Sequence, residues 1–275
     1  MPEGPEVRRA ADRIEKSLKD KILENVSCHH HALTGLESEL KGRKLLRVET
    51  YGKAFVLVFS TGHAIYVHLQ LYGVWKTGLR AHPPKSTRAL RLCLESEKHY
   101  ARLYSATDIQ SSDLPTIKNH PYIRKLGPDI LNSAYGVGHI SRRLKKKTFV
   151  KRTLGALLLD QSFFAGIGNY LRSEILFLSK LHPLFKPGML TAPQRTLLAR
   201  SIWTCLHRAY QTGGITTSPE YVQKSRDKGL RRRQYRHYVF SREGSSCPSC
   251  GLKITKDSFG GRRLYLCLQC QPSPK

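Results

Sequence analysis

The segment CPSCGLKITKDSFGGRRLYLCLQC, residues 247–270, decides the C-terminal part of the fold because it contains two Cys-x2-Cys pairs. Sixteen residues separate Cys247/Cys250 from Cys267/Cys270, and this is the spacing of a tetrathiolate zinc site. Four protein ligands leave no open coordination position, so the pattern predicts one structural Zn²⁺ rather than a catalytic metal. The alternative is four unrelated thiols.

The residues between the two cysteine pairs predict a β-hairpin. Gly260-Gly261 permits the positive φ angles of a two-residue turn, which places Arg262 at or beside the tip. Taken alone, an arginine at a hairpin tip is most simply a solvated charge.

A glycine-rich break, AGIGNY at residues 165–170, separates two helix-favouring stretches, 153–162 and 170–180. Glycines before a helix N-terminus expose backbone N–H groups that can bind phosphate, and the side-chain amide of Asn169 could join them. The alternative is an ordinary helical hairpin without a ligand. A further amphipathic helix is expected over residues 191–210, and the basic stretch 228–240 leads into the cysteine module.

The N-terminal half has a different pattern. Residues 5–18 predict a helix, because apolar side chains recur on one face at helical spacing. The β-rich runs VLVFS (56–60), AIYVHLQLYGVW (64–75) and ALRLCLES (89–96) follow, separated by turn-forming residues. They predict an antiparallel sandwich or barrel that ends near the Gly127-Pro128 break.

The charge of the chain points to a polyanionic partner. Lys and Arg number 47 against 20 for Asp and Glu, which gives a formal net charge of +27, and such a field attracts nucleic acid. On charge alone, a ribosomal or membrane-surface protein is the alternative. No apolar run approaches the roughly 20 residues of a membrane span, and MPEGPEVRRA lacks a signal-peptide pattern. The unpaired Cys28, Cys93 and Cys205 favour a reducing compartment.

The N-terminus itself is a candidate nucleophile. Removal of Met1 exposes Pro2, whose secondary amine can attack an aldehydic carbon and give an iminium directly. An α-amine titrates near about 7.7–8.0, against about 10.4 for lysine, so a larger share is neutral at physiological pH. Glu3 follows at once and could transfer protons. The alternative interpretation of MPEGPE is a polar segment that precedes the first helix. Lys53, at the start of the strand run YGKAFVLVF, is a second candidate, and for it the alternative is an exposed lysine at a strand edge.

Taken together, these segments resemble the formamidopyrimidine-DNA glycosylase/endonuclease VIII family, and closest the bacterial endonuclease VIII branch. The resemblance rests on MPEGPEVRR (1–9), Gly52-Lys53 before a strand run, LLLDQSFFAGIGNYLRSEIL (157–176) and GGRRLYLC-x2-CQ (260–271). These motifs occur in one order and cover essentially the whole chain.

The resemblance implies an α+β multidomain fold. The expected parts are an N-terminal antiparallel β-sandwich with a flanking helix (1–126), a helix–two-turn–helix DNA-binding domain (127–240) and a C-terminal zinc-finger β-hairpin (241–275). The implied activity is that of a base-excision-repair DNA glycosylase and AP lyase acting by β,δ-elimination on damaged double-stranded DNA. It implies no diffusible cofactor, no membrane, a monomer, and a bacterial cytoplasmic location with nucleoid association through DNA.

Roles for individual residues also follow from the resemblance. Pro2 is implied as the nucleophile that forms a Schiff base and Glu3 as the acid/base. Lys53 and Arg262 are implied to hold phosphates and to assist the chemistry. Asn169 is implied to bind the DNA backbone near the lesion.

The lesion preference follows from the same resemblance. Gln70, Leu71 and Tyr72 resemble the void-filling triad of endonuclease VIII, which favours oxidised pyrimidines, whereas the 8-oxoguanine branch usually has Gly and Met in place of Gln70 and Leu71. The segment GGITTSPEY (213–221) looks partly like the oxidised-purine branch, so an 8-oxoguanine/formamidopyrimidine glycosylase is the alternative.

Two positions depart from the family pattern. Lys125 stands where close relatives have a DNA-contacting arginine, with Arg124 beside it, and Lys does not reproduce bidentate phosphate contact. Arg262 is followed by Arg263, and the spacing of five to Cys267 selects Arg262. The resemblance leaves the role of Glu174 open. Outside enzymes, a non-catalytic zinc-ribbon nucleic-acid-binding protein explains the charge and cysteines, and an inactive family member that only recognises lesions is a third reading.

Overall fold

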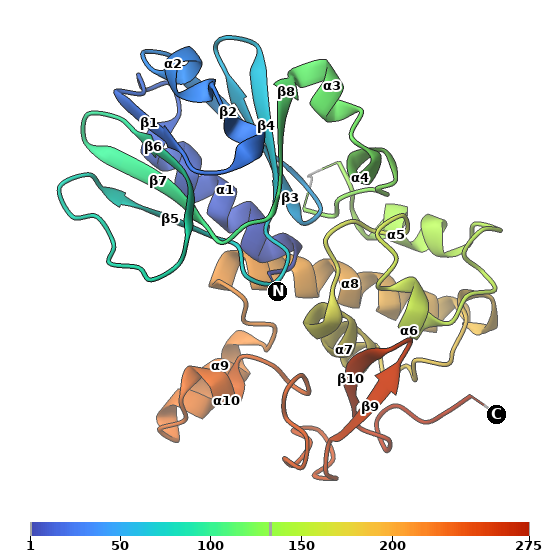
Figure 1. Cartoon of the computed structure of the whole chain (residues 1–275). Helices are drawn as coiled ribbons and strands as arrows, with labels where there is room; N and C mark the ends of the chain where they lie inside the picture. Colours follow the sequence, from blue (N-terminus) through green and yellow to red (C-terminus); the bar gives the residue numbers. More distant parts are fainter. Residues whose placement is uncertain (1, 132–133, 275) are drawn as a thin grey trace. The chain divides into compact units, whose positions relative to one another are not determined.

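The computed structural model describes residues 2–131 and 134–274. They form two compact units, and the chain passes from the first to the second between Lys125 and Leu126 (Figure 1). Each unit has its own hydrophobic core.

The first unit is a β-sandwich, as predicted. Its two four-stranded sheets have the orders β1-β6-β7-β5 and β2-β3-β4-β8, and every pairing in them is antiparallel. The elements are α1 (Gly4–Leu18), β1 (Asn25–Cys28), η1 (His31–Leu33), α2 (Leu36–Leu40), β2 (Leu45–Tyr51), β3 (Ala54–Phe59), β4 (His63–His68), β5 (Val74–Leu79), β6 (Leu90–Glu95), β7 (His99–Tyr104), β8 (Asp108–Asp113), α3 (Leu114–Lys118) and α4 (Pro121–Arg124).

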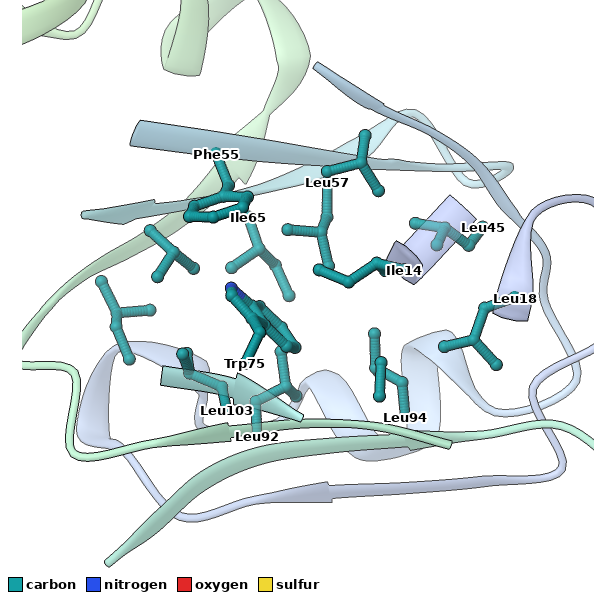
Figure 2. Close-up of a cluster of buried hydrophobic side chains, with 14 of the residues drawn as sticks. Ile14, Leu18, Leu45, Phe55, Leu57, Ile65, Trp75, Leu92, Leu94 and Leu103 are labelled. Atoms are coloured by element: carbon teal, nitrogen blue, oxygen red, sulfur yellow. The ribbon is translucent and has the colours of Figure 1, made fainter. Parts of the chain in front are cut away.

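The core of this unit lies between the two sheets. Figure 2 shows Phe55 and Ile65 from one sheet facing Leu92 and Leu103 from the other, with Trp75 between them. Helix α1 contacts strands of both sheets. Its apolar face is fully buried, as the helical spacing predicts.

The run AIYVHLQLYGVW is not one strand. It is divided into β4 and β5 by a turn at residues 69–73, and the two strands belong to different sheets. Gln70 has φ +49°, a left-handed conformation that alternating apolar residues do not indicate. The three residues of the predicted triad therefore lie on a turn between sheets.

The second unit is helical and ends in a β-hairpin. The elements are α5 (Val137–Leu144), α6 (Leu154–Leu157), α7 (Asn169–Leu178), η2 (Pro187–Met189), α8 (Ala192–Thr212), α9 (Pro219–Asp227), α10 (Arg232–Tyr235), β9 (Thr255–Phe259) and β10 (Arg262–Leu266). Helix α7 is buried along almost its whole length and packs against α8 and β10. In the described part of the chain, no helix is long and apolar enough to cross a bilayer.

Two predicted helices differ from the structure in length. The stretch 153–162 forms only the single helical turn of α6 before the chain enters consecutive turns. The helix expected over 191–210 begins at Ala192 and extends to Thr212, where Gly213 ends it with φ +73°.

The hairpin forms as the Gly-Gly pair predicts. Phe259 and Arg262 are directly paired, and Gly260 and Gly261 make the two-residue turn with φ +62° and +71°. Arg262 is therefore the first residue of β10, and its side chain is exposed.

Candidate active site

The four cysteines of the C-terminal module converge on one point. Their Sγ atoms all lie within 4.8 Å of one another, with Cys247–Cys270 at 3.8 Å and Cys250–Cys267 at 3.4 Å. Tetrahedral thiolates about 2.3 Å from Zn²⁺ would be separated by about 3.8 Å. The backbone N–H of Ser249 donates to Cys247 Sγ, and that of Leu252 lowers the pKa of Cys250. The cluster is built to hold a metal ion.

A fully buried arginine supports the hairpin that this cluster anchors. Arg172, on α7, is 0% exposed. Its guanidinium donates to the carbonyls of Gly155, Phe259, Arg262 and Arg263 at 3.0–3.3 Å. Because these bonds reach both strands beside the turn, Arg172 fixes the backbone from which the Arg262 side chain leaves.

Beside the hairpin lies a pocket of about 310 Å³. Its walls include Asn169, Ser241, Arg262 and Arg263. The Oδ1 atom of Asn169 is buried and has no hydrogen-bond partner among the described residues. Two guanidinium groups and an amide around one small pocket match the chemistry of a phosphate.

The side chain of Gln161 holds the loop that positions Asn169. The Gln161 side-chain amide donates to the carbonyls of Leu159 and Ile167 and accepts the N–H of Gly166, all at 2.9–3.0 Å. These three bonds shape the AGIGN loop, whose Gly166 has φ +91°. They place Asn169 at the first turn of α7.

Glu174, whose role the sequence left open, binds the segment that lines the pocket through Phe240. It is 0% exposed and accepts the N–H groups of Tyr238, Val239 and Phe240 at 2.7–2.9 Å. It also accepts the hydroxyl of Thr216 at 2.7 Å. The carboxylate thus connects α7 to two distant segments, one of which lines the pocket through Phe240.

The first unit carries Pro2 and Glu3 at the start of α1. Glu3 is the N-cap residue, is 4% exposed, and its N–H donates to Glu6 Oε2 at 3.0 Å. Glu3 is thus a nearly buried acidic residue directly after Pro2 in the chain, and an acid near an amine can exchange protons with it.

Lys53 lies in the two-residue turn between β2 and β3 and is 5% exposed. This rules out the alternative of an exposed edge lysine. Its backbone N–H donates to the Tyr122 hydroxyl at 3.2 Å. Burial and the charge of Lys53 lower the pKa of His68, while Asp108 opposes this shift. Lys53 is therefore close to the strand end from which the 69–73 turn begins.

The 69–73 turn presents two large side chains to solvent. Leu71 and Tyr72 are 66% and 71% exposed. The N–H of Gln70 donates to His68 Nδ1 at 3.1 Å, and that of Gly73 to the Leu69 carbonyl at 2.8 Å. A Cβ on Gly73 would lie 2.6 Å from the same carbonyl oxygen, so this position requires glycine. The turn is compact and its tip is apolar.

The predicted site residues thus fall into two groups. The structure brings Asn169 and Arg262 together in the second unit, whereas Pro2, Glu3, Lys53 and the 69–73 turn are in the first. Lys125 is the exposed C-cap residue of α4.

Sequence reasoning missed several residues that shape these groups: Gln161, Arg172, His68 and Arg88. One signal was present for Arg172, because it lies in the largely apolar helix NYLRSEILFL, and a charged side chain that such a helix buries needs partners.

Comparison with known proteins agrees with this architecture. Residues 1–106 match the model of the formamidopyrimidine-DNA glycosylase N-terminal domain, and residues 126–220 match that of the formamidopyrimidine-DNA glycosylase H2TH domain. Endonuclease 8 of Salmonella arizonae is 38% identical and that of Pectobacterium atrosepticum 37% identical, each over 98% of this chain and 100% of the relative.

Solved structures share the fold. Lactococcus lactis Fpg in complex with DNA containing an abasic site has a TM-score of 0.78 at 21% identity, covering 98% of this chain and 100% of that one. The same enzyme with DNA containing an oxidised pyrimidine also gives 0.78, at 22% identity, covering 99% and 100%.

The fold and these matches define a base-excision-repair DNA glycosylase with AP lyase activity, and hence a DNA-binding protein. The chain belongs to the formamidopyrimidine-DNA glycosylase/endonuclease VIII family. The predicted family, fold class and enzyme class are confirmed.

Proposed function

We propose that this enzyme removes oxidised pyrimidines from damaged double-stranded DNA through a covalent intermediate on Pro2. The observation that carries the proposal is that Glu3, the residue directly after Pro2, is only 4% exposed. An acid held next to a secondary amine can accept and return the protons that imine chemistry moves.

The reaction begins when Arg262, Asn169 and the exposed Lys125 bind phosphates. The damaged nucleotide leaves the stack, because the sugar carbon is unreachable inside the duplex. Gln70, Leu71 and Tyr72 fill the space it leaves.

The neutral amine of Pro2 then attacks C1′, and the bond from C1′ to the base breaks. The C1′–O4′ bond opens next, so that C1′ becomes the carbon of an iminium with the Pro2 nitrogen. Glu3 accepts the proton that the attacking amine loses and donates one to O4′. The resulting iminium acidifies the adjacent sugar proton. Its removal expels the 3′ phosphate by β-elimination, and the following δ-elimination expels the 5′ phosphate. Hydrolysis of the remaining imine releases the unsaturated sugar fragment and restores the Pro2 amine. The products are the free base, the sugar fragment and a one-nucleotide gap with phosphates at both ends, and no diffusible cofactor takes part.

We infer that the metal held by the four cysteines is one Zn²⁺. Four thiolates suit this ion and leave it no open position, so its contribution is to stabilise the hairpin that carries Arg262.

The preference for pyrimidines has support from both units. Leu71 and Tyr72 stand exposed on the 69–73 turn. In the segment that looks like the purine branch, Thr216 and Thr217 are 0% and 1% exposed. Their hydroxyls bind Glu174 and the Tyr235 carbonyl, so they are not free to read a base.

The remaining parts of the proposal follow from the predicted roles. The enzyme acts as a monomer in the bacterial cytoplasm, associated with the nucleoid through DNA. Its parts are a catalytic β-sandwich (1–126), a helix–two-turn–helix domain (127–240) and a zinc finger (241–275).

Borohydride trapping on a duplex with an abasic site tests the nucleophile. The reduced adduct is digested and mapped by mass spectrometry, and we expect it on Pro2. A protein that retains one extra N-terminal residue should bind the same duplex and form no adduct. An adduct on a lysine side chain, or normal cutting by the extended protein, would show that Pro2 is not the nucleophile.

The lesion preference needs a separate assay. Single-turnover release of thymine glycol should be faster than release of 8-oxoguanine opposite cytosine. The reverse order would place the enzyme in the oxidised-purine branch and leave the Pro2 chemistry unchanged.

A further inference from the structure

Arg88 binds the turn that carries Leu71 and Tyr72. Its guanidinium Nη1 donates to the Tyr72 carbonyl at 2.6 Å. Arg88 lies in the loop between β5 and β6, sixteen residues further along the chain. Because the bond is to a backbone oxygen, it controls where the turn lies rather than which side chains the turn carries.

The sheet topology explains how Arg88 reaches this oxygen. Strands β5 and β6 flank β7 and are both antiparallel to it, so they run parallel to each other. Val74 at the start of β5 and Leu90 at the start of β6 are both paired with Tyr104. Tyr72 and Arg88 lie two positions before these residues, and both are therefore at the same end of the sheet, where β5 and β6 begin.

The loop that carries Arg88 is itself restrained. Pro83 and Pro84 fix two φ angles in it. At its start, the N–H of Arg80 donates to the Lys98 carbonyl at 2.8 Å. At its end, Ser105 donates to the Ala89 carbonyl at 2.8 Å. The backbone from which the Arg88 side chain leaves is therefore restrained at both ends of the loop.

The turn needs such support. Gln70 has φ +49°, and a non-glycine residue keeps this conformation only when its surroundings enforce it. Its N–H is bound by His68 at one side of the turn, and Arg88 binds the other side at Tyr72. Two exposed apolar side chains would otherwise lose much conformational freedom on entering a base stack.

We propose that Arg88 is a positioning residue that holds the 69–73 turn ready for insertion into duplex DNA. The inference rests on the proposed function of Gln70, Leu71 and Tyr72. Arg88 touches no reacting atom in this scheme. Base excision from a duplex depends on it, whereas cutting at an abasic site in single-stranded DNA does not, because no stacked partner strand is disrupted there.

The test compares the full-length wild type with Arg88→Ala, Arg88→Lys and a matched control, Arg80→Ala, which removes an arginine of the same loop that binds Glu24 instead. We expect Arg88→Ala to slow thymine glycol release from a duplex about five- to tenfold, the effect of losing one hydrogen bond of typical strength. Lysine should restore part of the rate, and Arg80→Ala should retain it.

Two further measurements separate positioning from a direct phosphate contact. Cutting of a single-stranded abasic oligonucleotide and the salt dependence on undamaged duplex should match the wild type in Arg88→Ala. A salt slope lower by about 0.9 would instead indicate that Arg88 binds a phosphate, and equal losses on single and double strands would exclude the positioning role.

Hydrogen exchange of the free protein tests the inference independently of catalysis. The Gly73 amide, bonded to the Leu69 carbonyl, should exchange several-fold faster in Arg88→Ala and at the wild-type rate in Arg80→Ala. Unchanged exchange would overturn the positioning role even in an active enzyme. If Arg88→Ala exchanges faster but the wild-type protein excises no lesion, the positioning role of Arg88 is supported and the proposed function is contradicted.

Discussion

The backbone N–H of Lys53 donates to the Tyr122 hydroxyl at 3.2 Å, which connects the β2–β3 turn to α4. Tyr122 also packs edge-on against His68, with ring centroids 5.2 Å apart. One tyrosine therefore contacts both the turn that carries Lys53, which the family resemblance implies to assist the chemistry, and the residue that binds Gln70.

Replacing Tyr122 with Phe should reduce base excision about fivefold, since the hydrogen bond of one hydroxyl typically contributes about 1 kcal/mol. The ring remains, so packing is preserved while the bond to the Lys53 turn is lost. Tyr51→Phe is the control, because its hydroxyl is on the same hairpin but binds Glu49. Single-turnover rates of base excision measure the effect, and equal rates for wild type and Tyr122→Phe would show that the hydroxyl does not contribute.

The metal site makes a prediction about structure rather than turnover. Purified protein should contain one zinc per chain, and Cys250→Ser should lose it together with most duplex binding, because the hairpin carrying Arg262 is no longer anchored. Cys28→Ser, which changes a thiol outside the cluster, should keep both. Metal analysis and binding titrations measure this, and an absence of zinc from the wild type would contradict it.

Asn169→Ala should weaken binding to every duplex alike. The residue lines a pocket with two arginines, and this set of groups suits a phosphate, which every duplex presents. Binding isotherms over a range of salt concentrations provide the measurement, with lesion-containing and undamaged DNA side by side. A loss confined to one lesion would mean that Asn169 reads the base instead.

Glu174→Gln should loosen the segment that follows α10. The amide has one oxygen where the carboxylate has two, and its NH₂ group would face N–H donors. We therefore expect the free energy of unfolding to fall by about 2–4 kcal/mol. The Tyr238, Val239 and Phe240 amides that Glu174 now binds should exchange faster in hydrogen-exchange experiments. Glu243→Gln, an exposed partner of Lys256, is the control. Unchanged protection at all three amides would be inconsistent with the network.

His237 makes the second unit less stable in acid. Burial, with the charges of Arg236 and Arg232, lowers its pKa to about 3, whereas an unfolded histidine titrates near about 6.5. Between these values the unfolded chain binds a proton that the folded chain does not. Its contribution to stability is therefore complete above about pH 6.5 and is lost as the pH falls below it.

A His237→Phe variant keeps the stacking on Tyr170, seen with centroids 5.0 Å apart, and removes the titration. Between about pH 6 and 4.5 its unfolding free energy should fall less steeply than that of the wild type, by up to about 1.4 kcal/mol per pH unit. Denaturant unfolding followed by the helix signal in circular dichroism measures this. His82→Phe, an exposed change in the first unit, is the control, and parallel pH curves for wild type and His237→Phe would disprove the prediction.

Local sequence patterns were sufficient for much of the fold. The helical spacing from Val7 to Leu18, the Gly260-Gly261 turn and the cysteine spacing each depend on nearby residues, and each matches the structure. The run from Ala64 to Trp75 did not reveal its break, because the left-handed Gln70 is stabilised by contacts with His68 and Thr107 rather than by its own preference.

The supporting residues of the site were beyond the reach of sequence patterns for a related reason. Arg88 and Tyr72 meet only because two strands begin beside the same Tyr104. Arg172 binds a hairpin about ninety residues away. Pairings of this kind depend on tertiary topology, which a single sequence does not display.

The partners of Arg172 are carbonyl oxygens, a group that every amino acid presents. The support that Arg172 gives to the hairpin therefore depends on the backbone path and not on the identity of an exposed side chain such as Ser258. The outward surface of the hairpin can be rewritten by point substitution, in nature or in the laboratory, while the metal cluster and the arginine keep the new surface in register with the rest of the unit.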